Sequence, residues 1–157
     1  MKVLVTYFSA SGETKKLAEN IARIRNWDLV EIEPKVKYTP ADLNWNDRNS
    51  RSSQEMQDPA SRPELKQAIT VSGYDTILVG FPIWWGQAPR IIETFLESED
   101  FSGKAIIPFA TSGGSGMGRS ADLLQKLVPD AFVQNGCVLR ADSSAKEIEQ
   151  WLKTWQR

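Results

Sequence analysis

Three runs of apolar residues separated by helical patterns restrict most strongly how this chain can fold. The runs cover 2–8, 76–81 and 104–110. They lack the regular polar alternation of a half-exposed strand, so each is expected to be buried on both faces of a sheet. Buried strands that alternate with helices are typical of a parallel sheet with helices packed on both sides.

Two weaker strand patterns are expected at the edges of this sheet. Residues 28–33 alternate polar and apolar side chains, as a half-exposed strand does. A last strand falls in 131–139, where Asn135-Gly136 interrupts it. Pro108 has no backbone N–H to donate, so it is expected near the end of its strand or at a bulge.

Helical patterns lie between the strands. Ser61, Pro63 and Glu64 are typical of a helix start, and Ser144 with Glu147 forms a second capping motif. The expected helices lie in 13–25, 61–71, 89–96, 123–128 and 144–155. Five strands alternating with five helices predict a single α/β domain, 1–157, with a doubly wound five-stranded parallel sheet in the order 2-1-3-4-5.

The segment 34–61 breaks this regular pattern. It is long and polar, and it carries two aromatic residues, Tyr38 and Trp45. A loop of this length in a compact domain is often functional, which suggests a cover over a binding site. The alternative is a surface excursion with a short helix around 52–57.

The composition narrows the chemistry. The chain has no histidine and one cysteine, Cys137, which excludes a Ser-His-Asp triad, an internal disulfide and a multi-cysteine metal site. Its 19 basic and 20 acidic residues are scattered, so no nucleic-acid partner is expected. No apolar stretch approaches membrane-spanning length and no signal peptide is visible, which predicts a cytoplasmic location without a membrane partner.

The turn after the first strand has the features of an anion site. Ser9, Ser11, Gly12, Glu13 and Thr14 lie between an apolar strand and a helix. A helix start presents unpaired N–H groups and the positive end of its dipole, and the hydroxyls add donors. The alternative is that these hydroxyls only cap the helix.

The turns after the third and fourth strands are also unusual. In the predicted topology all three turns lie at the same edge of the sheet, where ligands bind in such folds. The second turn has two adjacent tryptophans, and the third is rich in serine and glycine. Taken singly, the tryptophans could be packing residues and the glycines a connector. The candidate residues are Pro82, Ile83, Trp84, Trp85 and Gly86 in the second turn, and Thr111, Ser112, Gly113 and Gly114 in the third.

Together the three turns describe an elongated ligand. One end is an anion at the first helix, and the other is a flat aromatic system between the second and third turns. FMN fits this description, because it has a terminal phosphate, a hydroxylated chain and an isoalloxazine ring.

The motifs resemble those of the flavodoxin family over nearly the whole chain. Ser9-x-Ser11-Gly12-x-Thr14 is similar to the phosphate loop of flavodoxins, and 81–86 and 109–114 resemble the two loops that hold the isoalloxazine ring. The resemblance implies a flavodoxin-like fold with bound FMN. It assigns the phosphate to 9–14, with Glu13 acting through its backbone, and the ring to 82–86 and 111–114. No catalytic side chain is implied.

Two departures from typical flavodoxins bear on function. The formal net charge is only -1, whereas typical flavodoxins are strongly acidic. The third turn also lacks the aromatic that often covers the flavin, although Tyr38 or Trp45 could supply one. An electron carrier with a redox partner protein is therefore one hypothesis, and an oxidoreductase using NAD(P)H and a small acceptor such as a quinone is another. A flavin-free module that binds a phosphate ligand or a partner protein is the third.

Overall fold

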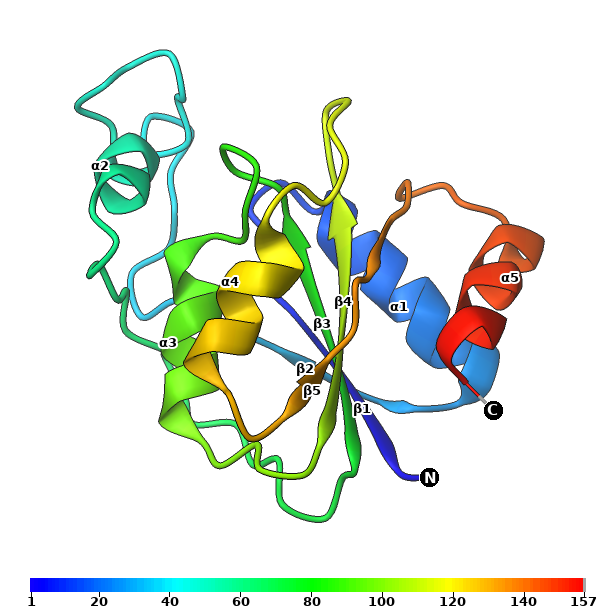
Figure 1. The fold of residues 1–157 in the computed structure, drawn as a ribbon. Coiled ribbons are helices and arrows are strands. Elements are labelled where there is room, and N and C mark those ends of the chain that lie inside the picture. The colour runs from blue at the N-terminus through cyan, green and yellow to red at the C-terminus, as the bar shows by residue number, and fades with distance from the viewer. Residues whose placement is uncertain (157) are drawn as a thin grey trace.

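A computed structural model describes residues 1–156 and contains a parallel sheet with the strand order β2-β1-β3-β4-β5 (Figure 1). The predicted α/β architecture and strand order are confirmed. The predicted last strand consists of two short ones, which both pair with β4. The strands are β1 (Val3–Tyr7), β2 (Asp28–Glu31), β3 (Thr76–Pro82), β4 (Ala105–Thr111), β5 (Phe132–Val133) and β6 (Cys137–Val138).

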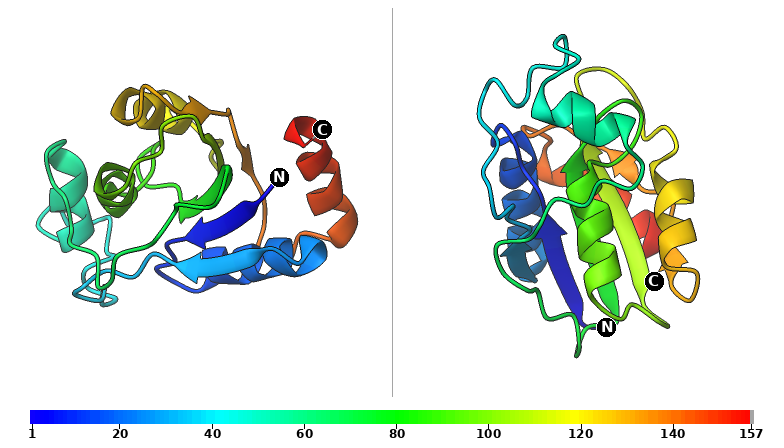
Figure 2. Two further views of the ribbon diagram at one scale, coloured as in Figure 1. Left: turned by 90° about the horizontal axis from the view of Figure 1, so that it is seen from below. Right: turned by 90° about the vertical axis from the view of Figure 1, so that its left-hand side faces the viewer.

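Two pairs of helices cover the sheet. One pair, α1 and α5, packs on one face, and α3 and α4 pack on the other (Figure 2, left). The side chains of β1 alternate between the two cores, since Val3, Val5 and Tyr7 face α1 and α5 while Leu4 faces α3. The helices are α1 (Glu13–Arg25), α2 (Arg51–Gln57), α3 (Arg90–Ser98), α4 (Ser120–Leu127) and α5 (Ala145–Trp155).

Pro108 lies in the middle of β4, opposite the gap between the short edge strands β5 and β6. Gln134 N–H donates to the carbonyl of Ile106 and Leu139 N–H donates to that of Ala110, so Pro108 faces the same edge. There the chain leaves the sheet at 134–136, between β5 and β6. The missing N–H of proline therefore falls where the neighbouring edge offers no strand to pair with. The expectation of a strand end or a bulge at Pro108 is wrong, because β4 continues through this residue in unbroken register with β3.

The prediction of a helix over 61–71 is wrong. This segment runs extended beside the chain that follows β2, and Lys66 N–H donates to the carbonyl of Glu33 at 2.8 Å. Ile69 and Val71 are both buried, at 5% and 2% exposure. Residues two apart face opposite sides of a helix but the same side of an extended chain, so burying both favours the extended form. The capping box at Ser144 is confirmed.

The only helix between β2 and β3 is α2, near the short helix that the alternative for 34–61 placed around 52–57. Ser50 caps it by accepting a hydrogen bond from the N–H of Ser53 at 3.3 Å. In Figure 1, α2 stands apart from the sheet, on the far side of α3. Within residues 1–156, none of the helices combines the length and the apolar composition that a membrane span requires.

Candidate functional site

The turns that follow β1, β3 and β4 lie together at one edge of the sheet (Figure 1). Ile83 N–H donates to the carbonyl of Thr111 at 2.9 Å, which joins the second turn to the third. The hydroxyls of Thr14 and Thr111 lie 2.8 Å apart and are buried, which joins the first turn to the third. We call these three turns, together with the first residues of α1 and Arg119 just before α4, the inner wall of the site; it comprises residues 8–14, 82–87 and 111–119.

The first turn is built around the start of α1. Gly12 adopts the left-handed conformation at φ 93°, which glycine tolerates without steric cost. Ser9 Oγ accepts hydrogen bonds from the N–H groups of Gly12 and Lys15, both at 3.1 Å. Among residues 1–156, no group accepts from the N–H of Glu13 or Thr14. These two donors lie at the positive end of the helix dipole and are available to an anion.

The second turn is a two-residue hairpin with Trp85 and Gly86 at its corner. Trp84 N–H donates to the carbonyl of Gln87 at 2.9 Å, and Gln87 N–H donates back at 3.2 Å. Both corner residues have positive φ, 50° and 75°, as a type I′ turn requires. Glycine suits this conformation, whereas a bulky indole residue is unusual in it.

The two tryptophans have different environments. Trp84 packs edge-on against Phe8 and Tyr38, with ring centroids 5.7 and 5.6 Å away. Trp85 is 48% exposed at the corner of the turn. Trp84 is thus partly a packing residue, and Trp85 is the freer indole.

The third turn is exposed to solvent around Gly113 and closely packed at Gly118, just before α4. Ser112 Oγ accepts from the N–H groups of Gly114 and Ser115, at 3.2 and 2.8 Å, and Gly113 is exposed. Gly118 approaches the second turn so closely that a Cβ there would lie 2.2 Å from the carbonyl oxygen of Gly86. This close contact fixes the position of the third turn relative to the second.

A cavity of about 660 Å³ lies against the first and second turns of the inner wall. This size is typical of a small-molecule site. Of the candidate residues, Ser11, Pro82, Ile83, Trp84 and Trp85 line it, whereas those of the third turn do not. One side comes from the first and second turns, and the other from the segment 34–61, which we call the cover segment. Sequence reasoning identified Trp45 in this segment but missed Leu43 and Ser52. The lining residues are Ala10, Ser11, Leu43, Trp45, Ser52, Pro82, Ile83, Trp84 and Trp85.

Side-chain contacts hold the cover segment in place. The Tyr38 ring packs on Phe8, and its hydroxyl donates to Glu55 of α2. The Arg51 guanidinium lies 3.7 Å from the centre of the Tyr38 ring. From α3, the buried Arg90 pairs with Glu93 at 2.7 Å and donates to the carbonyls of Glu55 and Met56 at 3.2 and 2.9 Å.

Two phenols near the site stay neutral over a wide pH range. Burial, with the hydrogen bond to Glu55 and the charge of that carboxylate, raises the pKa of Tyr38 well above its ordinary value. Burial and the Glu31 carboxylate raise the pKa of Tyr7 in the same way. Both phenols therefore act as hydrogen-bond donors at neutral pH.

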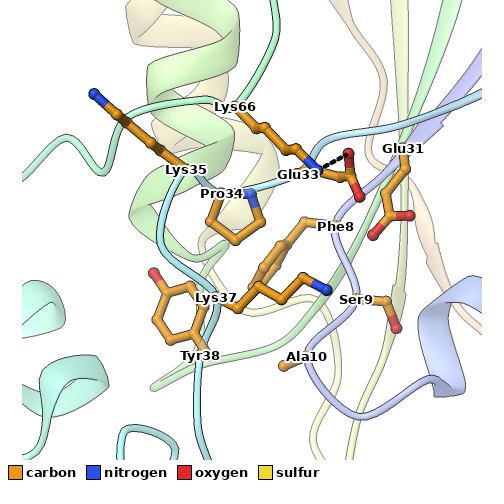
Figure 3. A pocket seen from close by; sticks show the side chains of 10 residues that line it. All are labelled: Phe8, Ser9, Ala10, Glu31, Glu33, Pro34, Lys35, Lys37, Tyr38 and Lys66. Atoms are coloured by element: carbon orange, nitrogen blue, oxygen red, sulfur yellow. Dashed lines mark ion pairs between the residues drawn. The ribbon is translucent and has the colours of Figure 1, made fainter.

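A smaller hollow of about 280 Å³ lies beside the first turn (Figure 3). Lys37 extends across it toward Ser9. The other two lysines around it are paired, because Lys66 lies 4.0 Å from Glu33 and Lys35 contacts Glu64 at 3.2 Å. Charges of both signs line this hollow, so its charge favours no single class of ligand.

A family model described as Flavodoxin matches residues 2–155. The chain belongs to the flavodoxin family. A proposed flavoprotein from Bacteroides eggerthii is 46% identical, with a TM-score of 0.92 over 98% of this chain and 96% of that one. A second, from Bacteroides uniformis, is 48% identical, with a TM-score of 0.92 over 97% of each chain.

A flavoprotein from Lactobacillus acidophilus, solved in complex with FMN, is 28% identical. It has a TM-score of 0.71 over 96% of this chain and 97% of that one. No match was found among curated proteins.

Proposed function

We propose that this flavodoxin-family protein binds FMN without a covalent bond and transfers electrons through it. The observation that carries the proposal is the 660 Å³ cavity, which joins the first turn to the indoles of Trp84 and Trp85. The related Lactobacillus acidophilus flavoprotein was solved with FMN, which supports the same ligand here.

The donors at the first turn fit a phosphate. The free N–H groups of Glu13 and Thr14, together with the exposed hydroxyl of Ser11, would hold it at the start of α1. The carboxylate of Glu13 is exposed, so this residue would contribute its backbone. The buried Thr14 hydroxyl is paired with Thr111, and it would act chiefly by keeping the first and third turns together.

The other two turns fit a flat ring system. The cavity side of the second turn is apolar, at Pro82, Ile83 and the indoles of Trp84 and Trp85. Gly86 turns the chain with its positive φ. Thr111, Ser112, Gly113 and Gly114, in the third turn next to the second, would offer backbone groups to the polar edge of a ring that extends beyond the cavity. Bound FMN supplies the electron-accepting and electron-donating chemistry, and the protein supplies binding, orientation and control of access.

Two forms of electron transfer suit this site. In the first, the protein carries electrons between redox partner proteins. In the second, it is an oxidoreductase that uses NAD(P)H and a small acceptor such as a quinone. The open third turn and the 70% exposed Trp45 favour the second form, because they leave room for a flat molecule beside the flavin. A cytoplasmic location remains a prediction from the sequence.

The first experiment is an FMN titration that follows the visible spectrum of the flavin and the tryptophan fluorescence. We expect one FMN per chain, and absence of uptake would overturn the proposal. The double variant Ser11→Ala/Thr14→Ala should weaken FMN binding, while Ser72→Ala, at an exposed serine before β3 and outside the three turns, serves as the hydroxyl control. Unchanged affinity in the double variant would contradict the phosphate assignment.

The second experiment separates the two forms of electron transfer. The FMN-loaded protein is mixed with NADH or NADPH without oxygen, and flavin absorbance is followed. Rapid bleaching by the dinucleotide alone supports an oxidoreductase. Persistence of the colour until a reductase protein is added supports an electron carrier.

A further inference from the structure

A second hollow adjoins the candidate flavin cavity. It has a volume of about 400 Å³ and lies between α2 and the residues just before α4. Trp45 and Trp85 line both spaces, so the two hollows meet at these indoles. A molecule that lies against the tryptophans can therefore extend from the flavin cavity into this hollow.

The hollow is positively charged. Arg48 and Arg119 line it, together with the neutral polar side chains of Ser53, Gln57 and Gln87, and no carboxylate does. The whole chain has a formal net charge of -1, so this local excess of positive charge differs from the average of the molecule. Two guanidinium groups beside aromatic surfaces are suited to a flat ligand that carries an anionic group.

The two arginines also differ from most others in the protein. Arg25, Arg51, Arg62, Arg90 and Arg140 each contact a carboxylate. Within residues 1–156, the arginines without a carboxylate inside 4.0 Å are Arg23, Arg48 and Arg119. Two of these three therefore line the same hollow, although they are 71 positions apart in the sequence.

Both arginines are tied to the walls of the flavin cavity. The backbone N–H of Arg119 donates to the carbonyl of Gly86 at 2.9 Å, next to Trp85. Arg48 belongs to the cover segment, and its carbonyl accepts from the Gln57 side chain at 3.4 Å. One arginine thus comes from the inner wall and the other from the cover segment, and both line the same hollow.

We propose that this hollow is an anion subsite for the small molecule that exchanges electrons at the flavin cavity. The flat part of that molecule lies against Trp45 and Trp85, and its sulfonate, carboxylate or phosphate group pairs with Arg48 and Arg119. The inference rests on the proposed flavin function, and it specifies the substrate class as anionic. The anion can come from the phosphates of a nicotinamide dinucleotide or from an acidic group on a quinone-like acceptor.

The test compares 1,4-naphthoquinone-2-sulfonate with uncharged 1,4-naphthoquinone. Binding of each is measured by quenching of tryptophan fluorescence, on the FMN-saturated and on the FMN-free protein. We expect the sulfonate to bind more tightly, and Arg48→Gln or Arg119→Gln each to weaken it about fivefold at low salt, with little effect on the parent compound. Arg48→Lys and Arg119→Lys should retain much of the preference, because they keep the charge.

Arg23→Gln is the matched control. It removes the same charge from an exposed, unpaired arginine near the far end of α1, and it should leave both affinities unchanged. The proposal is overturned if the wild type shows no preference for the sulfonate, or if the preference survives in the Arg48→Gln/Arg119→Gln double variant. Thermal unfolding of each variant checks that the fold is intact.

A failure of the flavin proposal can be distinguished from a failure of the anion-subsite proposal. If the protein takes up no FMN, the measurement on the FMN-free protein still shows whether the two arginines select an anion. AMP and adenosine, titrated into the FMN-saturated protein, separate the two sources of the anion. Tighter binding of AMP than of adenosine, lost in the arginine variants, indicates that the anion comes from a dinucleotide. If only the sulfonate is preferred over its uncharged counterpart, the anion belongs to an acidic acceptor.

Discussion

The two walls of the candidate flavin cavity are held by different kinds of interaction. The inner wall continues directly from the sheet, and backbone hydrogen bonds such as those of Ile83 and Arg119 join its turns. The cover segment is held mainly by side chains, above all Tyr38, Arg51 and Arg90. Backbone pairing next to a buried sheet shares the stability of the whole fold, whereas a segment held by a few polar side chains can open locally. We therefore expect the inner wall to be rigid and the cover segment to respond to single substitutions.

The largest effect is expected in the inner wall, from Gly118→Ala. The new Cβ would lie 2.2 Å from the carbonyl oxygen of Gly86, and the backbone has a φ of 58°. Both the clash and the left-handed conformation oppose alanine, so the free energy of unfolding should fall by about 3 kcal/mol. Denaturant unfolding measures this loss, and FMN titration should show weaker binding because the Trp85 turn is displaced.

Gly113→Ala is the control for this substitution. It lies in the same turn, but no atom lies within 4 Å of its added Cβ and its φ is outside the left-handed region. Its stability should stay close to that of the wild type. Equal losses in the two variants would show that the inner wall is not a tightly joined unit.

The next effect concerns the cover segment, through Arg90→Met. This change removes the hydrogen bonds to the carbonyls of Glu55 and Met56, but Glu93 keeps its contact with Arg62 at 3.1 Å. Because one partner of Glu93 remains, we expect a loss of about 2 kcal/mol, below the usual cost of breaking a buried ion pair. Limited proteolysis should show faster cleavage within 34–61.

Arg140→Met is the matched variant on the surface. Arg140 contacts Asp142 at 3.1 Å, but both side chains are more than two-thirds exposed, so little stability should be lost. If Arg90→Met accelerates cleavage no more than Arg140→Met does, Arg90 does not anchor the cover segment.

Much of the fold follows from local patterns in the sequence, and the cover segment shows where those patterns are insufficient. The apolar runs of β1, β3 and β4 and the turns after them identify the sheet and the inner wall, because each signal lies in consecutive residues. In 61–71, which begins where the cover segment ends, Ser61 and Glu64 resemble a capping box, yet the burial of Ile69 and Val71 against the core favours an extended chain. The tertiary environment prevails there over a weak local propensity.

The same reason explains which site residues sequence reasoning missed. Leu43 and Ser52 line the cavity because contacts between distant side chains hold α2 in position, among them those of Arg90 on a helix far along the chain. Arg90 looks like an ordinary surface cation in the sequence, since its buried partners come from another segment. Contacts between distant side chains leave no periodic signal that a single sequence can reveal.

A smaller effect should separate the two roles of Trp85. It adopts a left-handed conformation, which asparagine tolerates better, so Trp85→Asn should raise the free energy of unfolding of the FMN-free protein by about 1 kcal/mol. FMN affinity should fall at the same time, because the indole lines the cavity. Denaturant unfolding of the FMN-free protein measures the gain in stability, and FMN titration measures the loss of affinity.

Trp45→Asn is the corresponding change in the cover segment. Trp45 also lines the cavity, but its backbone φ is negative, so FMN binding should weaken without any gain in stability. A gain of equal size in both variants would mean that loss of an exposed indole, and not relief of strain, explains the result for Trp85→Asn.

The smallest expected effect is a pH dependence of the free energy of unfolding, which arises at Tyr38, where the two walls are in contact. Tyr38 packs on Phe8 of the inner wall and donates to Glu55 of the cover segment, with Arg51 and Asp42 nearby. Its pKa is raised by folding from an ordinary value of 10.0. Above pH 10 the unfolded chain therefore loses this proton while the folded protein keeps it, so stability falls as the pH rises.

Tyr38→Phe removes both the pH dependence of stability that arises from this phenol and the hydrogen bond to Glu55. At neutral pH the variant should be less stable than the wild type by at most about 1 kcal/mol. The difference should shrink above pH 10, because only the wild type loses the Tyr38 contribution there. Tyr7→Phe is the control on the sheet side, since the pKa of Tyr7 is also raised but its partner Glu31 belongs to β2. Accelerated proteolysis of 34–61 at high pH should thus depend on Tyr38 and not on Tyr7, and equal dependence on both would show that the whole fold opens as one unit.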